Sequence, residues 1–184
     1  YRITNLPGGH RATTRWSSVF IPTLILTIGD RDEVWSIPEM TLRDILQDIW
    51  NVVYGDITHT VTTTGPVIAI ALQRLSDWRH NIGHSAVSVL ASFMLSQDDV
   101  ETDRDREDFA NSLLFKLGFL YGHITEDGKF QKPFQSDLIL EVLVQHGHST
   151  SGAINRHRSP TDITHARGAI GLITAAACIS TLAS

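Results

Sequence analysis

Apolar residues recur at helical spacing through most of the chain, and the longest such pattern covers residues 65–97. Pro66 stands at a first helical position, where its missing N–H costs no hydrogen bond. Apolar residues then share one face up to Leu75, and a second apolar run begins after Asn81 and Gly83. The pattern predicts two apolar helices in the middle of a core, joined at Gly83 by a kink or a tight turn.

Shorter patterns of the same kind predict further helices on both sides of this pair. They are expected at residues 20–29, 41–54 and 109–121, from residue 136 to about 147, and from residue 160 to the end of the chain. Thr41 with Asp44 and, separately, Ser136 are the expected N-caps. Pro22 excludes a continuous straight helix upstream of it, and β-branched residues leave a buried strand as the alternative for residues 19–28.

These elements make an all-α fold the predicted class, because helical patterns follow one another without alternating strand patterns. Residues 1–15 show no periodicity and are expected to form an N-terminal arm, followed by a single globular domain of about seven helices over residues 16–184. The last helix is rich in Gly and Ala. Glycine costs a helix about 1 kcal/mol relative to alanine, so we expect neighbours that approach this backbone closely and a helix buried centrally.

Composition adds limits on environment and partners. Of the 184 residues, 42% are hydrophobic and 19% charged, as in an ordinary packed domain, and the net charge of -5 offers no overall positive field to nucleic acid. Cys178 is the only cysteine and no N-x-S/T sequon occurs, so we expect an intracellular protein. No cofactor is implied. The closest candidate for a membrane span, residues 166–183, contains Arg167, Thr174 and Ser180, so none is expected.

Five segments together resemble a known family. They are residues 20–24 (FIPTL), 46–54 (LQDIWNVVY), 71–79 (ALQRLSDWR), 119–122 (FLYG) and 136–140 (SDLIL). In this order they resemble a helical domain of unknown function that is widespread in mushroom-forming basidiomycete fungi. The resemblance implies a fungal origin and a helical domain over residues 16–182 of a longer polypeptide, which a chain opening at Tyr1 also leads us to expect. It implies no catalytic residue.

His80 and His84 are the first candidates for chemistry. Their spacing of four places two imidazoles on one face of a helix, where they can bind zinc. With a carboxylate such as Asp77 they would support a metal-dependent hydrolase or nuclease, in which the metal activates a water. Position 81 is Asn rather than the general-base Glu of a zinc protease, and Gly83 is expected to break the helix. A polar helix junction is therefore the preferred interpretation.

Basic residues before the last helix indicate a candidate anion site, and together with arginines of the N-terminal arm they indicate a candidate nucleic-acid site. A small anion site would use His148, Arg156 and Arg158 beside the N-terminus of the helix expected from Pro160, with a solvated loop as the alternative. Nucleic-acid binding would need one basic face made by six arginines. These are Arg2, Arg11, Arg15, Arg156, Arg158 and Arg167. The acidic net charge makes nucleic acid the least favoured partner.

Other motifs are incomplete. Ser85 and Ser149 occur in near matches to a nucleophile elbow, but both lack the closing glycine and neither follows a strand pattern. The acidic residues at 98–108 resemble a calcium loop without its central glycine or its last glutamate, so they predict a solvated loop. Residues 125–134, which contain an Asp-Gly pair, predict a second loop.

Four aromatic residues near helix ends are candidates for an interaction surface, with burial in a core as the alternative for each. They are Trp50, Tyr54, Trp78 and Tyr121. Because the apolar pattern is complete and no catalytic groups converge, the leading hypothesis is a non-enzymatic helical module of a larger fungal protein. It would bind a partner protein or form a homo-oligomer.

Overall fold

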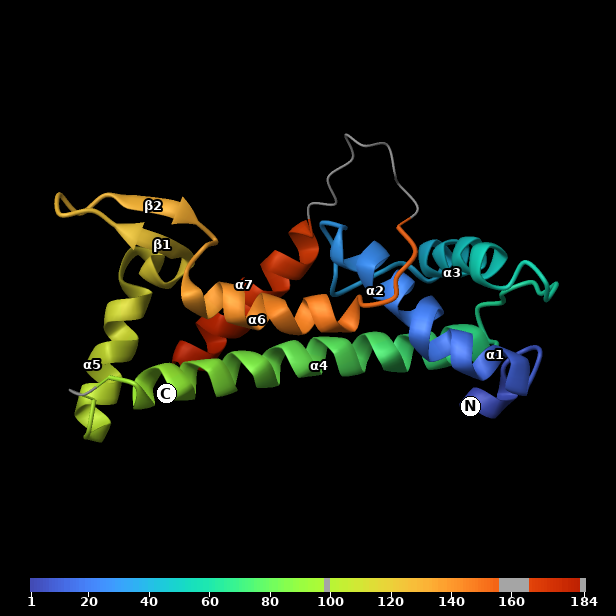
Figure 1. Cartoon of the computed structure of the whole chain (residues 1–184), viewed down its shortest axis with the longest axis horizontal. Helices are drawn as coiled ribbons and strands as arrows, with labels where there is room; N and C mark the ends of the chain where they lie inside the picture. Colours follow the sequence, from blue (N-terminus) through green and yellow to red (C-terminus); the bar gives the residue numbers. More distant parts are fainter. Residues whose placement is uncertain (98–99, 156–165, 183–184) are drawn as a thin grey trace. The chain divides into compact units, whose positions relative to one another are not determined.

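The computed structural model describes residues 1–97, 100–155 and 166–182, with the backbone alone at residues 10–12. The chain divides into two compact units. Residues Tyr1–Trp78 and Gly147–Ala169 form the first unit, and residues Arg79–His146 and Ile170–Ser184 form the second. Because three helices contribute to both units, the single domain predicted from the sequence stays a prediction. Over the described residues the chain is helical apart from one two-stranded sheet, which confirms the predicted class at this coarse level (Figure 1).

The first unit begins with four short helical segments. They are η1 (Ile3–Asn5), α1 (His10–Arg15), η2 (Trp16–Phe20) and α2 (Ile21–Gly29). The last of them confirms the helix predicted at residues 20–29 and excludes the strand alternative. The chain upstream of Pro22 is also helical, but the π-helix η2 lies between α1 and α2, so no continuous regular α-helix runs through Pro22. The N–H of Ile21 donates to the carbonyl of Trp16, and this wide turn accommodates a proline without a donor.

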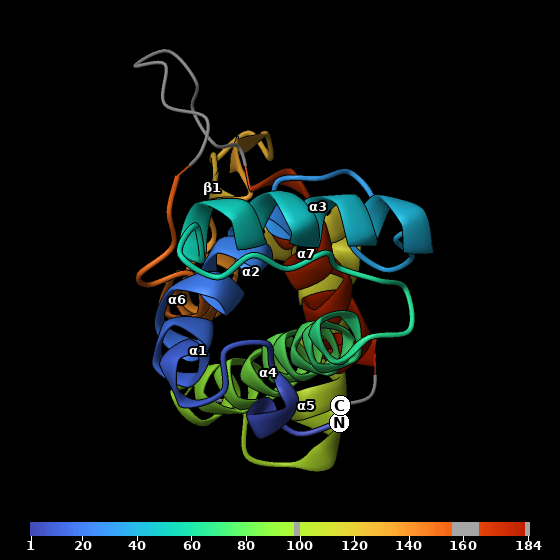
Figure 2. The ribbon, with the colours of Figure 1, turned by 90° about the vertical axis from the view of Figure 1, so that its right-hand side faces the viewer.

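Helix α3 (Glu39–Val53) packs against α2 within the first unit (Figure 2). It begins before Thr41, so the predicted cap is wrong and this threonine lies inside the first turn. Pro38, with an extended ψ of 136°, precedes the helix, and Glu39 supplies a carboxylate that suits the positive helix N-terminus. Asp44, expected to complete the cap, instead accepts a hydrogen bond from Arg43 at 2.9 Å.

Aromatic rings from η2 and α3 form the centre of the first unit. Trp16 stacks on Phe20 with ring centroids 4.4 Å apart, and Trp50 lies against Tyr54 at 4.3 Å. All four side chains are at most 1% exposed. Burying a large apolar side chain contributes about 1.5–3 kcal/mol, so this aromatic cluster is a principal source of stability in the unit.

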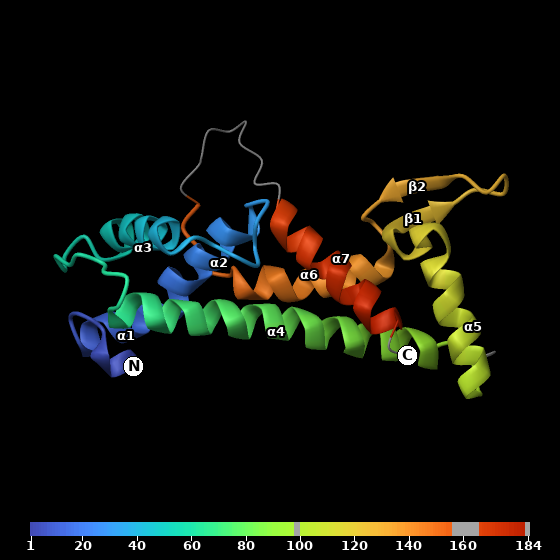
Figure 3. The same cartoon turned by 180° about the vertical axis from the view of Figure 1, so that it is seen from behind.

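Helix α4 (Pro66–Leu95) is one continuous helix, drawn as an unbroken ribbon in Figures 1 and 3. The prediction of two helices joined at Gly83 is therefore wrong. A glycine costs a helix interior only about 1 kcal/mol, and burial of residues on both sides of it offsets that cost. Leu75, Ile82 and Ala86 are all fully buried.

In the second unit, α5 (Asp103–Leu114) is followed by η3 (Phe115–Leu120). The helix predicted at residues 109–121 is therefore misplaced at both ends. Thr102 starts the helix early, since its hydroxyl accepts from the N–H of Asp105 and its own N–H donates to that carboxylate at 2.8 Å. The Thr102 hydroxyl also donates to the Asp105 carboxylate, at 2.7 Å, and this bond together with the one from the Thr102 N–H lowers the pKa of Asp105. The acidic residues thus occupy the first turns of a helix, where the helix dipole favours them.

Strands β1 (Tyr121–Ile124) and β2 (Phe130–Pro133) form an antiparallel hairpin where the sequence predicted a loop. In its turn, the N–H of Thr125 donates to the carbonyl of Lys129 at 2.9 Å. Gly128 adopts a φ of 74°, which glycine reaches without a steric penalty. An Asp-Gly pair is typical of hairpin turns as well as of loops, so the sequence is also consistent with a hairpin at this position.

The last two helices match the prediction in part. Helix α6 (Asp137–Ser149) begins at its predicted cap, because the buried Ser136 hydroxyl accepts from the N–H of Ile139 at 3.3 Å. Helix α7 (Arg167–Leu182) is described from Arg167, and the predicted start at Pro160 lies outside the described residues. Gly168, Ala169 and Ala177 are buried, whereas Gly171 is exposed and Ile179 is 65% exposed, so burial on every side is not observed.

Candidate functional site

His80 and His84 lie on consecutive turns of α4, and both side chains are exposed. Their Nε2 atoms are 2.9 Å apart and their ring centroids 4.3 Å apart. The predicted pair therefore does come together, because α4 continues through Gly83 instead of breaking there.

Asp77 is engaged elsewhere. Its carboxylate accepts a hydrogen bond from Arg74 at 3.1 Å, one turn earlier on α4. In the part of the chain that the structure describes, no three His, Cys, Asp or Glu side chains are grouped so that they could hold one metal ion. A hydrolytic metal centre at His80 and His84 would need a further protein ligand, and the described residues place none beside them.

The predicted anion site falls largely outside the described residues. His148 is exposed on α6, but Arg156 and Arg158 are not among the residues that the structure describes. The side chain of Arg11, a candidate for nucleic-acid binding, is likewise outside them.

Two other arginines that were candidates for nucleic-acid binding form ion pairs with carboxylates. Arg15 donates to both oxygens of Asp56 at 2.7 and 2.8 Å and to the carbonyl of Val53 at 3.1 Å. The hydrogen bonds to Asp56 raise the pKa of Arg15. Arg167 lies 3.6 Å from Asp32. Arg15 therefore satisfies the C-terminal end of α3, where a basic side chain is favourable, instead of facing a phosphate backbone.

Most of the aromatic residues predicted for an interaction surface are buried. Trp50 and Tyr54 are 1% exposed and Trp78 is 2% exposed, so these three present no surface to a partner in this conformation. The indole N–H of Trp50 donates to the carbonyl of Ile57 at 2.9 Å, which satisfies its polar edge inside the core. Tyr121 differs from them because it is only half-buried.

Burial raises the pKa of Tyr54 from 10.0 to about 12, an effect that the nearby Arg15 partly offsets. The unfolded chain therefore loses this phenolic proton at a lower pH than the folded chain. We expect the contribution of Tyr54 to the free energy of unfolding to be complete below pH 10.0 and to be lost as the pH rises toward about 12. Urea denaturation at several pH values across this range measures it.

The matched variants for this prediction are Tyr54→Phe and Tyr1→Phe, since Tyr1 is 72% exposed. The first should flatten the fall in stability over this pH range, and the second should leave it as in the wild type. A fall of the same size in Tyr54→Phe and in the wild type would show that another group is responsible.

The serine motifs have no catalytic setting. Ser85 lies within α4 and Ser149 ends α6, so neither occupies the strand-to-helix turn that exposes a nucleophile. The acidic run, apart from residues 98–99 outside the described residues, lies before and within α5. Its end is helical and not a cation-binding loop.

A surface that sequence reasoning missed lies in the second unit. The chain contains three lysines, and all of them lie in η3 and the hairpin although the chain as a whole is acidic. Lys129 pairs with Asp127 at 2.7 Å, whereas Lys116 and Lys132 have no ion-pair partner within the described ranges. Large apolar side chains in this segment are 45–64% exposed. We define the hairpin surface as Phe115, Lys116, Leu117, Ile124, Lys129, Lys132 and Phe134.

The backbone of the hairpin surface is unusual. Four of its residues have a positive φ, between 51° and 58°, namely Lys116, Leu117, Lys132 and Phe134. Residues with a Cβ rarely adopt this region, which costs roughly 1–2 kcal/mol each. Strained backbone of this kind is concentrated at functional positions, so its occurrence here favours a role for the surface beyond stability.

A hollow of about 190 Å³ lies in the second unit and is lined by residues of α4, α5, η3, β1 and α6. Apolar side chains including Phe93, Phe119 and Leu138 line it, together with Tyr121. The Tyr121 ring lies 4.9 Å from that of Phe130 in the neighbouring strand. Of the four predicted interaction residues, Tyr121 is therefore the one that lies at an open surface.

Comparison with protein-family models, with curated proteins and with solved structures finds no match for this chain. None of the described helices combines the length and the apolar character needed to cross a lipid bilayer. The functional argument therefore depends on the hairpin surface and on the histidine pair.

Proposed function

We propose that this chain is a non-enzymatic helical module of a larger fungal protein, and that it self-associates through the hairpin surface. The fungal setting depends on the sequence resemblance alone. The observation that carries the proposal is the separation of opposite charges along α5. Glu101, Glu107 and Asp108 are exposed before or within its first half, whereas Lys116 and Lys132 follow its other end.

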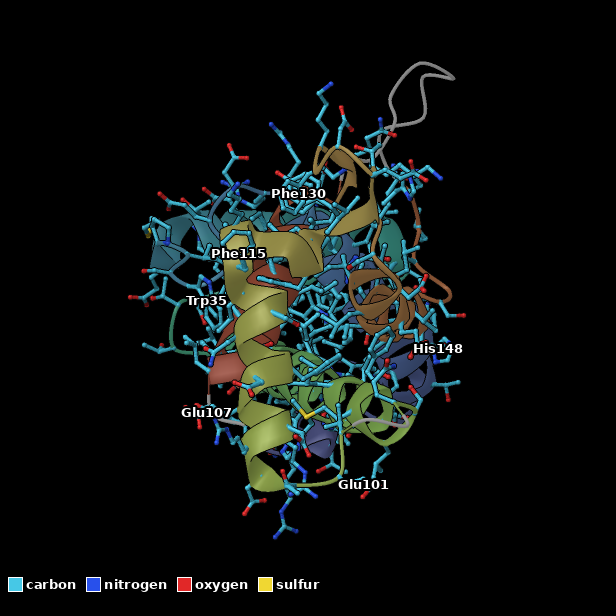
Figure 4. All side chains as sticks on the ribbon, turned by 90° about the vertical axis from the view of Figure 1, so that its left-hand side faces the viewer. Trp35, Glu101, Glu107, Phe115, Phe130 and His148 are labelled. Atoms are coloured by element: carbon cyan, nitrogen blue, oxygen red, sulfur yellow. The ribbon has the colours of Figure 1, made fainter. Side chains whose placement is uncertain are left out.

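Figure 4 shows α5 with three of the residues around it labelled. Glu101 and Glu107 lie toward the lower end of α5, and Phe115 lies toward its upper end. The helix has 12 residues, and a helix of that length spans about 18 Å. Glu107 and Asp108 have no ion-pair partner among the residues described. These two carboxylates, like the side chains of Lys116 and Lys132, are therefore available to pair with charges on a second molecule.

A second copy fits this pattern because two-fold symmetry exchanges both contacts at once. If two α5 helices lie antiparallel, the acidic start of each comes beside the hairpin surface of the other. The antiparallel helix dipoles also attract each other. Phe115, which is 64% exposed, supplies the kind of aromatic side chain that dominates binding energy in interfaces. Opposite charges then determine the orientation of the pair.

The test is the mass in solution, measured by light scattering over roughly a hundredfold range of protein concentration. We expect the mass to rise from 20.4 kDa toward twice that value. Raising NaCl from about 0.05 to about 0.5 M should weaken the dimer at least about tenfold, because exposed charges are screened. The variant Lys116→Glu with Lys132→Glu should remain monomeric at every concentration.

The control variant is Arg43→Glu with Arg74→Glu. It changes the net charge by the same amount at side chains that are 34% and 46% exposed and lie outside the hairpin surface. This control should dimerise like the wild type. A wild-type mass of 20.4 kDa throughout the concentration range would rule out self-association. The alternative hypothesis would then be that the module binds a different protein.

A further inference from the structure

The distance between the Nε2 atoms of His80 and His84 determines the angle that these two atoms would form at a metal ion bound to both. Imidazole nitrogen binds transition metals at about 2.0–2.1 Å. Two nitrogens at that distance from one ion, and 2.9 Å from each other, form an angle of about 90° at the ion. A tetrahedral ion would separate them by about 3.3 Å. The separation of the two nitrogens is therefore the one expected for two adjacent positions of a square-planar or octahedral ion.

This geometry selects a class of metal. Square-planar and tetragonal sites with nitrogen and oxygen ligands are typical of Cu²⁺ and Ni²⁺, and Cu²⁺ binds most tightly among the divalent first-row ions. Zn²⁺ prefers the wider tetrahedral angle. A two-histidine site also fits the absence of any group of three metal-ligating side chains from the described part of the chain.

The surroundings of the pair permit binding. Both imidazoles are exposed, and a Cβ placed on Gly83 between them would meet nothing within 4 Å. Water molecules can therefore complete the coordination sphere. The helix beneath is held in place by Ile82 and Ala86, which are fully buried, so the spacing of the two histidine backbones is set by a packed helix.

We propose that His80 and His84 bind one Cu²⁺ or Ni²⁺ ion per chain, with water as the remaining ligands. The site is independent of the proposed self-association, because neither histidine belongs to the hairpin surface. It is a binding site and not a hydrolytic centre.

The experiment is isothermal titration calorimetry of the full chain without a histidine tag. CuCl₂ and NiCl₂ are titrated into separate samples. We expect one ion per chain and tighter binding of Cu²⁺ than of Ni²⁺. His80→Ala and His84→Ala should each weaken binding at least about tenfold, since each removes one of two protein ligands. His148→Ala is the matched control, an exposed helical histidine without another histidine four residues away, and it should bind like the wild type.

Electron paramagnetic resonance of the Cu²⁺-loaded chain gives a second readout, with coupling to two imidazole nitrogens expected in the wild type and to one in either single variant. Equal affinity of the wild type and the double variant His80→Ala with His84→Ala would overturn the proposal. The short contact would then be only a hydrogen bond between two imidazoles.

Discussion

Trp50→Ala should lower the free energy of unfolding by about 3–5 kcal/mol, the range for removing a large aromatic side chain from a core. Trp50 is 1% exposed, and its ring centroid lies 4.3 Å from that of Tyr54 and 5.1 Å from that of His59. The substitution leaves a cavity among these rings. It also removes the indole donor from the carbonyl of Ile57. Urea denaturation followed by circular dichroism measures the loss.

The matched control is Trp35→Ala, because Trp35 is 62% exposed in the same unit. This variant should change stability by no more than about 0.5 kcal/mol. If Trp50→Ala does not fold, Trp50→Phe keeps most of the ring volume and should still cost about 1–3 kcal/mol through the unpaired carbonyl and the smaller ring. Equal losses in the alanine variants at positions 50 and 35 would contradict the assigned core.

Gly168→Ala is expected to destabilise the first unit by about 2 kcal/mol or more, although alanine is the better helix former. A Cβ at this position would overlap the carbonyl oxygen of Arg31 and a methyl group of Val34, and would lie 3.2 Å from the Arg31 carbonyl carbon. Backbone atoms cannot move aside as the end of a flexible side chain can. The helix would therefore have to shift away from the loop, and the denaturation midpoint reports that cost.

Gly171→Ala provides the control on the same helix. A Cβ at Gly171 meets nothing within 4 Å, and the residue is exposed. Its replacement should stabilise the chain by up to about 1 kcal/mol through helix propensity. Opposite signs for the two substitutions would support the close approach of α7 to the backbone of Arg31, and stabilisation by both would refute it.

Local rules were sufficient where one signal dominated. The cap at Ser136 and the helix at residues 20–29 follow from residue type and periodicity, and the structure has both. The close approach expected for the Gly-rich last helix is present at Gly168.

Errors arose where several weak effects had to be compared. The low helix propensity of Gly83 predicts a break in the helix. Its cost of about 1 kcal/mol is small, however, compared with the packing energy of a 30-residue helix. The acidic residues at 98–108 predict a loop, but Thr102 and Asp105 have the spacing of a capping box and begin a helix there. The histidine geometry depends on that unbroken helix. The left-handed residues in η3 and the hairpin are Lys116, Leu117, Lys132 and Phe134, none of them a residue type that favours this conformation, so no local pattern predicts them.

The most direct test of self-association is a charge-exchange experiment by light scattering. One variant carries Lys116→Glu with Lys132→Glu, and the other carries Glu107→Lys with Asp108→Lys. In each variant alone, two copies would oppose like charges at both contacts, so each should remain at 20.4 kDa. An equimolar mixture restores opposite charges at both contacts and should give a dimer. A mixture that stays monomeric under conditions where the wild type dimerises would contradict the proposed interface.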